Sequence, residues 1–368
     1  MTKQLLANCP QFKIILQATV LLILAFSAAV FAQKQPKDST KIKLGPLFKK
    51  DELLELKLTA NLKTLLKDRK DAKAPYRWAT VQCLDPQNGL DSLKIKVKTR
   101  GNFRRLASNC GFPPLLLNIP SKKDKGTVFE HQNLLKLITH CQDEAYVFQE
   151  YLVYKMYNLL TEESFKARLA KVTYQDSAGK LKPETKYAFL LEDETTLAKR
   201  NKAENANRKQ LPMYLIDSTS MATVSIFEYL IGNTDWSLPF LHNIKLLSRK
   251  DVPLLAVPYD FDHSGIVEAN YARPAEALEL NSVKQRLYRG ITYDMALFQK
   301  VFDNFRRVKP QIYALYEGNP LLDAGYIKRT IKYLDAFYAT IDDPKSLKKT
   351  FIEGGKKNGL QVIIKGLN

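Results

Sequence analysis

Alternating apolar and polar residues dominate the chain up to residue 192. Residues 53–58 alternate as a half-buried strand does, and a short helix is expected over 61–70. Asp143 stands where it can cap a long amphipathic helix that runs to Leu160. Further strands are expected, in chain order, at 77–83, 93–99, 113–119, 133–139, 169–174 and 187–192.

The pattern changes near residue 193 and becomes mostly helical. One helix is expected over 223–231, ending at Gly232, a residue suited to a left-handed C-cap. Two later helices are expected at 295–305 and 326–341, and the main exception to the helical pattern is a hairpin of 244–247 with 254–259. The chain is therefore predicted to be an α+β protein. Its strand-rich N-terminal lobe would span 47–192, and its mainly helical C-terminal lobe 193–368.

The first 32 residues have the form of a secretory signal peptide. Lys3 and Lys13 precede an uncharged run, and the small residues Val30 and Ala32 occupy the −3 and −1 positions before Gln33. Export to the periplasm, the cell surface or the medium is therefore expected, with residues 33–46 as a flexible tether. A retained anchor is the alternative. No membrane span is expected once the signal is removed, because no other window is apolar enough.

Charge and cysteine content narrow the partners of the exported protein. The formal charge is +19, and removing residues 1–32, which hold two lysines and no acid, lowers it to about +17. The basic residues are spread along the chain without a nucleic-acid motif, so specific nucleic-acid binding is not expected. In an oxidising compartment we expect one disulfide, favour Cys110–Cys141 and expect Cys83 to be left over. The sequence gives no oligomeric state.

Acidic and amide side chains gather between residues 235 and 262. Asp235 lies in a loop, Asn243 opens the first strand of the predicted hairpin, and Asp260 and Asp262 follow its second strand. The hairpin would bring these residues together at one end. Their oxygen atoms suit Mg²⁺ or Mn²⁺. Phosphoryl transfer uses such a set: one Asp orients the accepting hydroxyl, and an Asn and a second Asp hold the metal on the nucleotide phosphates.

The chain resembles the CotH-type (spore-coat protein H) kinase-like family, in particular its exported bacterial members. The motifs that carry this resemblance are Val97-Lys-Thr-Arg-Gly-Asn102, Phe112-Pro-Pro-Leu115, Leu135-Lys-Leu137, Phe148-Gln-Glu150, Tyr187-Ala-Phe-Leu-Leu-Glu-Asp193, Asn233-Thr-Asp-Trp236, His242-Asn243 and Tyr259-Asp-Phe-Asp262. The resemblance implies an atypical protein-kinase-like bilobal fold, ATP with a divalent metal (Mg²⁺ or Mn²⁺), and a protein substrate in the envelope or outside the cell.

The same resemblance implies roles for single residues. Asp235 matches the catalytic aspartate and Asn243 a metal-binding asparagine, while Asp260 matches the metal aspartate of a D-F-D version of D-F-G, with Asp262 as a competitor for that role. Lys136, on a strand before the long helix, would reach the phosphates with Glu150 as its ion-pair partner. The sequence lacks a G-x-G-x-x-G loop, so Arg100 and Arg104 would have to hold phosphate oxygens. Glu192 lies where the lobes would hinge and is assigned to the cofactor site.

Two other classes of function fit the sequence. In the first, the protein keeps the fold without catalysis and binds acidic polymers or an assembly partner of the envelope through its basic surface. In the second, a metal hydrolase would use Asp235, His242, Asp260, Asp262 and His263, although no H-E-x-x-H spacing supports it. Stoichiometric zinc in the purified protein would favour the hydrolase. Binding that survives loss of Asp235 but fails at high salt would favour the non-catalytic class.

Overall fold

The regular alternation of the N-terminal strands closes them into a seven-stranded barrel. In the computed structural model, which describes residues 44–85, 89–120 and 124–358, every second residue of these strands points inward. The strands are β1 (Leu54–Ala60), β2 (Arg77–Asp85), β3 (Gly89–Thr99), β4 (Leu115–Asn118), β5 (Leu134–Ile138), β6 (Ala167–Asp176) and β7 (Glu184–Leu191). The predicted signal peptide lies outside the described residues, as does the tether up to residue 43. Gly45, within the predicted tether, is buried.

The barrel follows the order β1-β2-β3-β4-β5-β7-β6 and closes by a parallel pairing of β1 with β6, in which Leu54 lies opposite Ala170. The other neighbouring strands pair antiparallel. Apolar side chains of all seven strands, together with α2 (Pro46–Lys49) and α3 (Leu62–Asp68), form one buried cluster. The burial of this cluster is the main stabilising contribution to the barrel.

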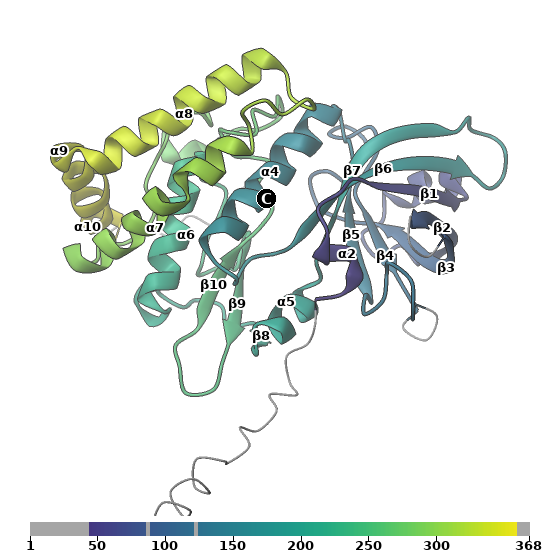
Figure 1. Cartoon of the computed structure of the whole chain (residues 1–368), viewed down its shortest axis with the longest axis horizontal. Helices are drawn as coiled ribbons and strands as arrows, with labels where there is room; N and C mark the ends of the chain where they lie inside the picture. Colours follow the sequence, from purple (N-terminus) through teal and green to yellow (C-terminus); the bar gives the residue numbers. More distant parts are fainter. Residues whose placement is uncertain (1–43, 86–88, 121–123, 359–368) are drawn as a thin grey trace, which may run out of the picture. The chain divides into compact units, whose positions relative to one another are not determined.

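Helix α4 (Glu144–Leu160) connects the barrel to the helical part of the chain. Asp143 caps it by accepting a hydrogen bond from the backbone N–H of Ala145 at 2.9 Å. The helix is buried nearly all round, because it packs on β6 and β7 and also on the later helices α6 and α7. Figure 1 shows α4 between the barrel strands and the C-terminal helices.

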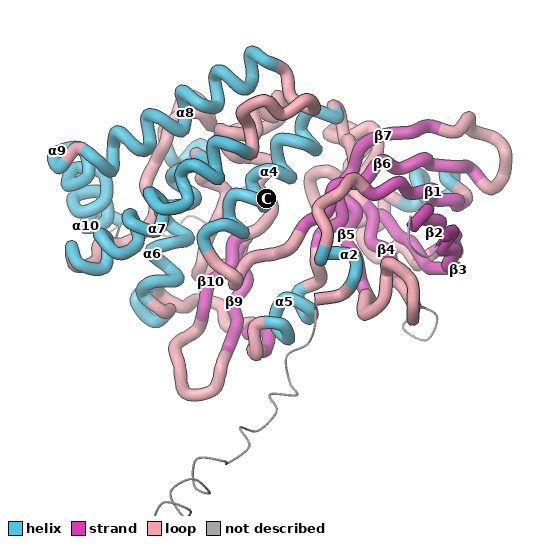
Figure 2. Tube along the Cα trace, in the orientation of Figure 1, coloured by secondary structure: helices cyan, strands magenta, loops and turns pink. Residues whose placement is uncertain are grey.

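The C-terminal part is mostly helical around a second hydrophobic cluster. Figure 2 shows these helices beside the short strands β9 and β10. The elements are α5 (Glu194–Arg200), β8 (Glu204–Ala206), η1 (Met213–Leu215), α6 (Ser218–Ile231), β9 (Ile244–Ser248), β10 (Leu255–Pro258), η2 (Glu276–Leu278), α7 (Met295–Ala314), α8 (Ala324–Asp342), α9 (Pro344–Leu347), η3 (Lys348–Glu353) and α10 (Gly354–Asn358). The strands pair in the order β10-β9-β8. Helix α6 ends at Gly232, where φ is +68° and an added Cβ would lie 2.1 Å from the Tyr333 hydroxyl, so only glycine fits.

The predicted strands and main helices are present, and the α+β class is confirmed. The finer expectation of a bilobal kinase-like fold is not shown, because the N-terminal strands form a closed barrel. A boundary at residue 193 does not separate two cores either. Helix α4 and the outward residues of β6 and β7 belong to the second hydrophobic cluster, and the described residues from 44 onward form one compact unit. Within the described residues, no helix is long and apolar enough to cross a membrane.

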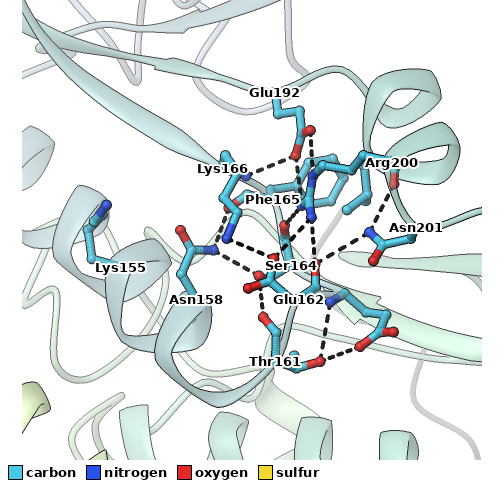
Figure 3. A network of polar contacts seen from close by, with 12 residues as sticks. Lys155, Asn158, Thr161, Glu162, Ser164, Phe165, Lys166, Glu192, Arg200 and Asn201 are labelled. Carbon is cyan, nitrogen blue, oxygen red and sulfur yellow. Dashed lines mark hydrogen bonds and ion pairs between the residues drawn. The ribbon is translucent and has the colours of Figure 1, made fainter. Parts of the chain in front are cut away.

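A polar network fixes the connections between the barrel and the helical part. Figure 3 shows Arg200 of α5 at its centre. Its guanidinium donates to both carboxylate oxygens of Glu192, at 2.8 and 3.1 Å, and to the backbone carbonyls of Glu162 and Ser164. Glu192 also accepts a hydrogen bond from the backbone N–H of Lys166 at 3.0 Å. The segment after α4, the end of β7 and α5 are thereby held together.

Candidate functional site

The loop that follows β3 brings three arginines to the site, and its shape is set by Arg69. The side chain of Arg69 donates hydrogen bonds to the backbone carbonyls of four residues in this loop: Arg105, Leu106, Cys110 and Gly111. Cys110 at the end of the loop is joined to Cys141 by the favoured disulfide, which the structure confirms. Cys83 is buried. The loop is therefore tied at several points, which restricts where Arg100 and Arg104 can lie.

Arg104 is enclosed by three carboxylates that come from distant parts of the chain. Its Nη1 lies 2.8 Å from Oε2 of Glu150 on α4, and its Nη2 lies 2.6 Å from Oδ1 of Asp260. Its Nε lies 3.3 Å from Oδ2 of Asp262, which also accepts a hydrogen bond from the Tyr271 hydroxyl at 3.1 Å. We call Glu150, Asp260 and Asp262 together with Arg104 the Arg104 cluster. One positive charge is set against three acidic groups, so the cluster carries surplus negative charge when all three are ionised.

The acids of this cluster differ in their affinity for protons. Burial raises the pKa of Glu150 to about 7, and the nearby charges of Asp262 and Asp260 add to this effect against the attraction of Arg104. Burial acts in the same direction on Asp260, but Arg104 and Arg100 outweigh it and the pKa of Asp260 is lowered. The side chain of Asp260 is also 38% exposed. Glu150 thus holds a proton more readily than Asp260 does.

Backbone conformation helps to aim the acids and the amide. Asp260 has φ of +64° and Asn243 has φ of +53°, in the left-handed region that Asp and Asn tolerate better than most residues. The backbone N–H of Asp260 donates to the buried Tyr154 hydroxyl at 2.9 Å. Such conformations cost on the order of 1 kcal/mol each and persist where the surrounding structure enforces them. They frequently occur at functional sites.

Asp235 is the centre of a second polar group. Its Oδ1 lies 2.8 Å from His242 Nε2, and its backbone carbonyl accepts a hydrogen bond from Asn243 Nδ2 at 2.7 Å. The same Asn243 amide lies 3.2 Å from Asp235 Oδ2, and the Asp235 N–H donates to Asn233 Oδ1 at 3.0 Å. The hairpin therefore brings Asp235 and Asn243 into contact, and the Asp235 carboxylate is oriented by two side chains.

A buried acid that the sequence interpretation missed lies behind Asp235. Glu228 of α6 is 1% exposed, and among the described residues neither of its carboxylate oxygens has a hydrogen-bond partner. Burial raises the pKa of Glu228 well above its usual range, an effect that Asn233 and Arg289 oppose and that Asp235 reinforces. Glu228 therefore holds a proton more readily than an exposed glutamate does. Its signal in the sequence is a single acid within the apolar helical run Ser225–Ile231.

The Asp235 group and the exposed side of the Arg104 cluster line one cavity of about 590 Å³, a size typical of small-molecule sites. Its walls combine acidic and amide residues with a basic side supplied by β3 and the loop after it. The acidic and amide residues are Asn102, Asp235, Asn243, Asp260 and Asp262, and the basic ones are Lys98, Arg100, Arg104 and Arg105. His242 and His263 also line it. Opposite charges across one cavity suit a ligand that has anionic groups and also binds a cation.

The predicted pairing of Lys136 with Glu150 is wrong. Lys136 Nζ lies 3.2 Å from Glu194 Oε1, and Glu150 is bound by Arg104 instead. Lys136 projects from β5 over the rings of Phe165 and Tyr259, where burial and the neighbouring Arg100 charge lower its pKa. Arg104, predicted to hold phosphate, in fact makes the contacts to Glu150 that were expected of the lysine. Lys136 is not among the described residues that line the cavity.

Glu192, predicted to belong to the cofactor site, lies in the Arg200 network instead. Its side chain is fully buried, and both of its oxygens are used by Arg200 and the Lys166 backbone. Burial raises the pKa of Glu192, and Arg200 opposes that shift. The residue is not part of the cavity wall as described. Its role in the structure is to hold α5 against the segment after α4.

The residues present fit a divalent cation at the Arg104 cluster. Within the described chain, the group of His, Cys, Asp and Glu residues whose ligand atoms come close enough is Glu150, Asp260 and Asp262, with oxygens within 4.8 Å of one another. Three carboxylates are the donor set that Mg²⁺ and Mn²⁺ prefer, and they carry the charge to bind one. No histidine belongs to this group, which disfavours the hydrolase set. Asn243, predicted as a metal ligand, instead donates a hydrogen bond to the backbone carbonyl of Asp235.

Comparisons with known proteins add little to this geometry. No protein-family model matches the chain, and no curated protein matches it. A solved structure described as a Helicobacter pylori proinflammatory kinase, CtkA, is similar to it with a TM-score of 0.38 and 12% identity, covering 72% of this chain and 95% of that one. At that TM-score the likeness carries no argument about fold or activity. The assignment to the CotH-type family remains a prediction.

Proposed function

We propose that the protein is an exported, metal-dependent phosphotransferase that moves the γ-phosphoryl group of ATP to a hydroxyl of a protein in the envelope or outside the cell. The observation that supports this most is the cavity in which Asp235 and Asn243 share one space with Asp260, Asp262 and the basic residues after β3. Phosphoryl transfer depends on positioning and on charge stabilisation more than on covalent chemistry. The cavity supplies both kinds of group.

Each group has a part in this reaction. Asp235 would accept the proton of the attacking hydroxyl, and His242 and Asn243 hold its carboxylate in place. The new phosphorus–oxygen bond forms to the acceptor while the bond to the ADP oxygen breaks, so ADP leaves with the electron pair. Arg100 and Lys98 would attract the phosphates. Glu150, Asp260 and Asp262 would hold a divalent ion, which when bound supplies charge neutralisation at the phosphates.

Substitutions at single acids separate binding from transfer. Asp262→Asn should lose Mn²⁺-dependent ATP binding, measured by calorimetry. Asp235→Asn should still bind but transfer phosphate roughly 10²–10⁴-fold more slowly, which is the usual contribution of a general base. Asp251→Asn, in the exposed turn of the same hairpin, is the matched control and should change neither quantity. Absence of ATP binding in the parent protein with Mn²⁺ would overturn the proposal.

A second candidate is the non-catalytic envelope protein. The position of Arg104 favours it, because a guanidinium contacts all three acids that would hold the metal. In that case Mn²⁺ would not bind to the parent protein, and a polyanion would bind equally well to the parent and to Asp235→Asn. The binding would weaken steeply as the salt concentration rises.

A further inference from the structure

The outward face of β3 carries a row of lysines. Leu93, Ile95 and Val97 point into the barrel and are buried, while Lys94 and Lys96 are exposed and Lys98 is half-buried. Side chains on one face of a strand repeat about every 7 Å, so the three ammonium groups form an evenly spaced row. Among the described residues, none of the three has an ion-pair partner.

Aromatic rings on β2 and directly before it accompany this row. Trp78 of β2 lies opposite Lys96 in the register and is 60% exposed. The Nζ atoms of Lys94 and Lys96 lie 4.8 and 5.0 Å from the centre of its ring. Lys98 Nζ lies 4.8 Å from the ring centre of Tyr76. Large aromatic side chains are enriched at surfaces that bind another molecule.

The row leads into the cavity. Lys98 lines it, and so does Arg100, two residues further along the chain. From Lys94 to Arg100 the track is about 20 Å long, at roughly 3.3 Å per residue. A molecule bound along β3 would therefore have one end at the phosphoryl-transfer site.

We propose that this surface, defined by Lys94, Lys96, Lys98 and Trp78, docks an extended acidic segment of the protein substrate next to its acceptor hydroxyl. That the segment belongs to a substrate rests on the proposed function. The docking of an acidic segment does not. Acidic side chains at alternate positions of an extended peptide have the same spacing as the lysines. Its apolar side chains would cover Trp78. The charge of the chain without residues 1–32, +19 less the two lysines of that segment and so about +17, adds long-range attraction for such a segment.

A peptide-binding assay without nucleotide tests the docking directly. The probe is a fluorescent peptide of about ten residues, with Glu at alternate positions and one Ser, a length that spans the track. Lys94→Glu/Lys96→Glu should weaken its binding at least about tenfold. The control Lys57→Glu/Lys171→Glu changes the net charge equally at exposed positions of β1 and β6, and should weaken binding less than about twofold.

A second readout comes from the tryptophans. The chain has two, and Trp236 is buried, so a fluorescence change on adding peptide should come from Trp78. Trp78→Phe should abolish that change. Because Trp78 and the lysines are on the surface, these variants should fold normally. They should bind ATP with Mn²⁺ as tightly as the parent protein does.

The outcomes separate the alternatives. Equal loss of binding in the two double variants would show that only net charge matters and would overturn the proposal. Equal binding of a neutral or lysine-rich peptide would also overturn it, and so would binding of polyphosphate at these lysines without binding of the peptide. Peptide binding in a protein that transfers no phosphate would leave the docking surface standing and reject the kinase function.

Discussion

Two arginines of this protein are equally buried but lie in opposite kinds of surroundings. The side chains of Arg104 and Arg200 are both 8% exposed. Arg200 is bound by one buried carboxylate, that of Glu192, and by backbone carbonyls, with the exposed Glu162 carboxylate 3.6 Å away. Arg104 is bound by three carboxylates from three separate segments and borders a cavity. The first arrangement balances charge, and the second leaves more negative charge than one arginine can compensate.

This difference separates a structural ion pair from a candidate site. Removing one partner of a buried pair is costly wherever the pair lies, so burial alone does not indicate function. Surplus like charge beside a cavity destabilises the fold unless something binds there, and such sites are where functional groups cluster. On this basis the Arg104 cluster is the functional candidate, and the Glu192–Arg200 pair is part of the scaffold.

The largest expected effect comes from removing each arginine. Arg104→Met and Arg200→Met should each lower the free energy of unfolding by about 3–5 kcal/mol, because buried carboxylates lose their partner. Mn²⁺ at a hundred times its Kd should restore about 2.7 kcal/mol to Arg104→Met. The same concentration should stabilise Arg200→Met less, because Arg104 still competes with the ion for the three carboxylates there. Urea denaturation with and without Mn²⁺ measures both effects.

Two results would contradict that expectation. If Mn²⁺ stabilises both variants equally, Arg104 does not compete with the ion for the three carboxylates. If it stabilises neither, the three carboxylates do not form a metal site. The control is Arg104→Lys, which shortens the side chain but keeps its positive charge. It should lose less stability than Arg104→Met.

The next effect is a dependence on pH. The folded pKa of Glu150 is raised to about 7 from an unfolded value of 4.5, so the folded state holds a proton that the unfolded state releases. Its contribution to stability is present below pH 4.5 and is lost as the pH rises to about 7. Between pH 5 and 7 the parent should therefore lose on the order of 2 kcal/mol more than Glu150→Gln, which cannot ionise.

Above about pH 7 the two stability curves should run parallel. Glu228 also has a raised pKa, but it is present in both proteins and its contribution cancels in the difference. Parallel curves over the whole range from pH 5 to 8 would show that Glu150 keeps an ordinary pKa and that its burial is compensated by Arg104. Denaturant midpoints at half-unit pH steps decide between these results.

Local patterns predicted much of this molecule, and long-range contacts account for what they missed. Strand alternation and helix caps depend on near neighbours, so β1 to β7 and the Asp143 cap were predicted correctly. Asp235 and Asn243 were predicted to meet because a hairpin places them together, and they do. The closure of the barrel requires β1 to pair with β6, more than a hundred residues away, and no local pattern indicates that pairing.

The pairing errors have the same origin. Arg104 lies 46 positions from Glu150 and 156 from Asp260, and their meeting depends on how the loop after β3 and helix α4 are placed in space. Glu192 was assigned to the site from its position between the predicted lobes. Its partner Arg200 lies only eight residues further on, but charge pattern alone does not tell which of several nearby basic residues it will meet.

The smallest expected effects are at the edges of the two arginine centres. Tyr271→Phe removes the hydroxyl that donates to Asp262 and should cost about 1.5 kcal/mol, as for a hydrogen bond to a charged group. The ring contacts with Phe103 and His263 remain, so packing is conserved. Glu162→Ala removes a carboxylate that is 77% exposed beside Arg200 and should cost less than about 1 kcal/mol. Equal losses in the two variants would mean that the edge of the Arg104 cluster is as accessible to water as the surface around Glu162.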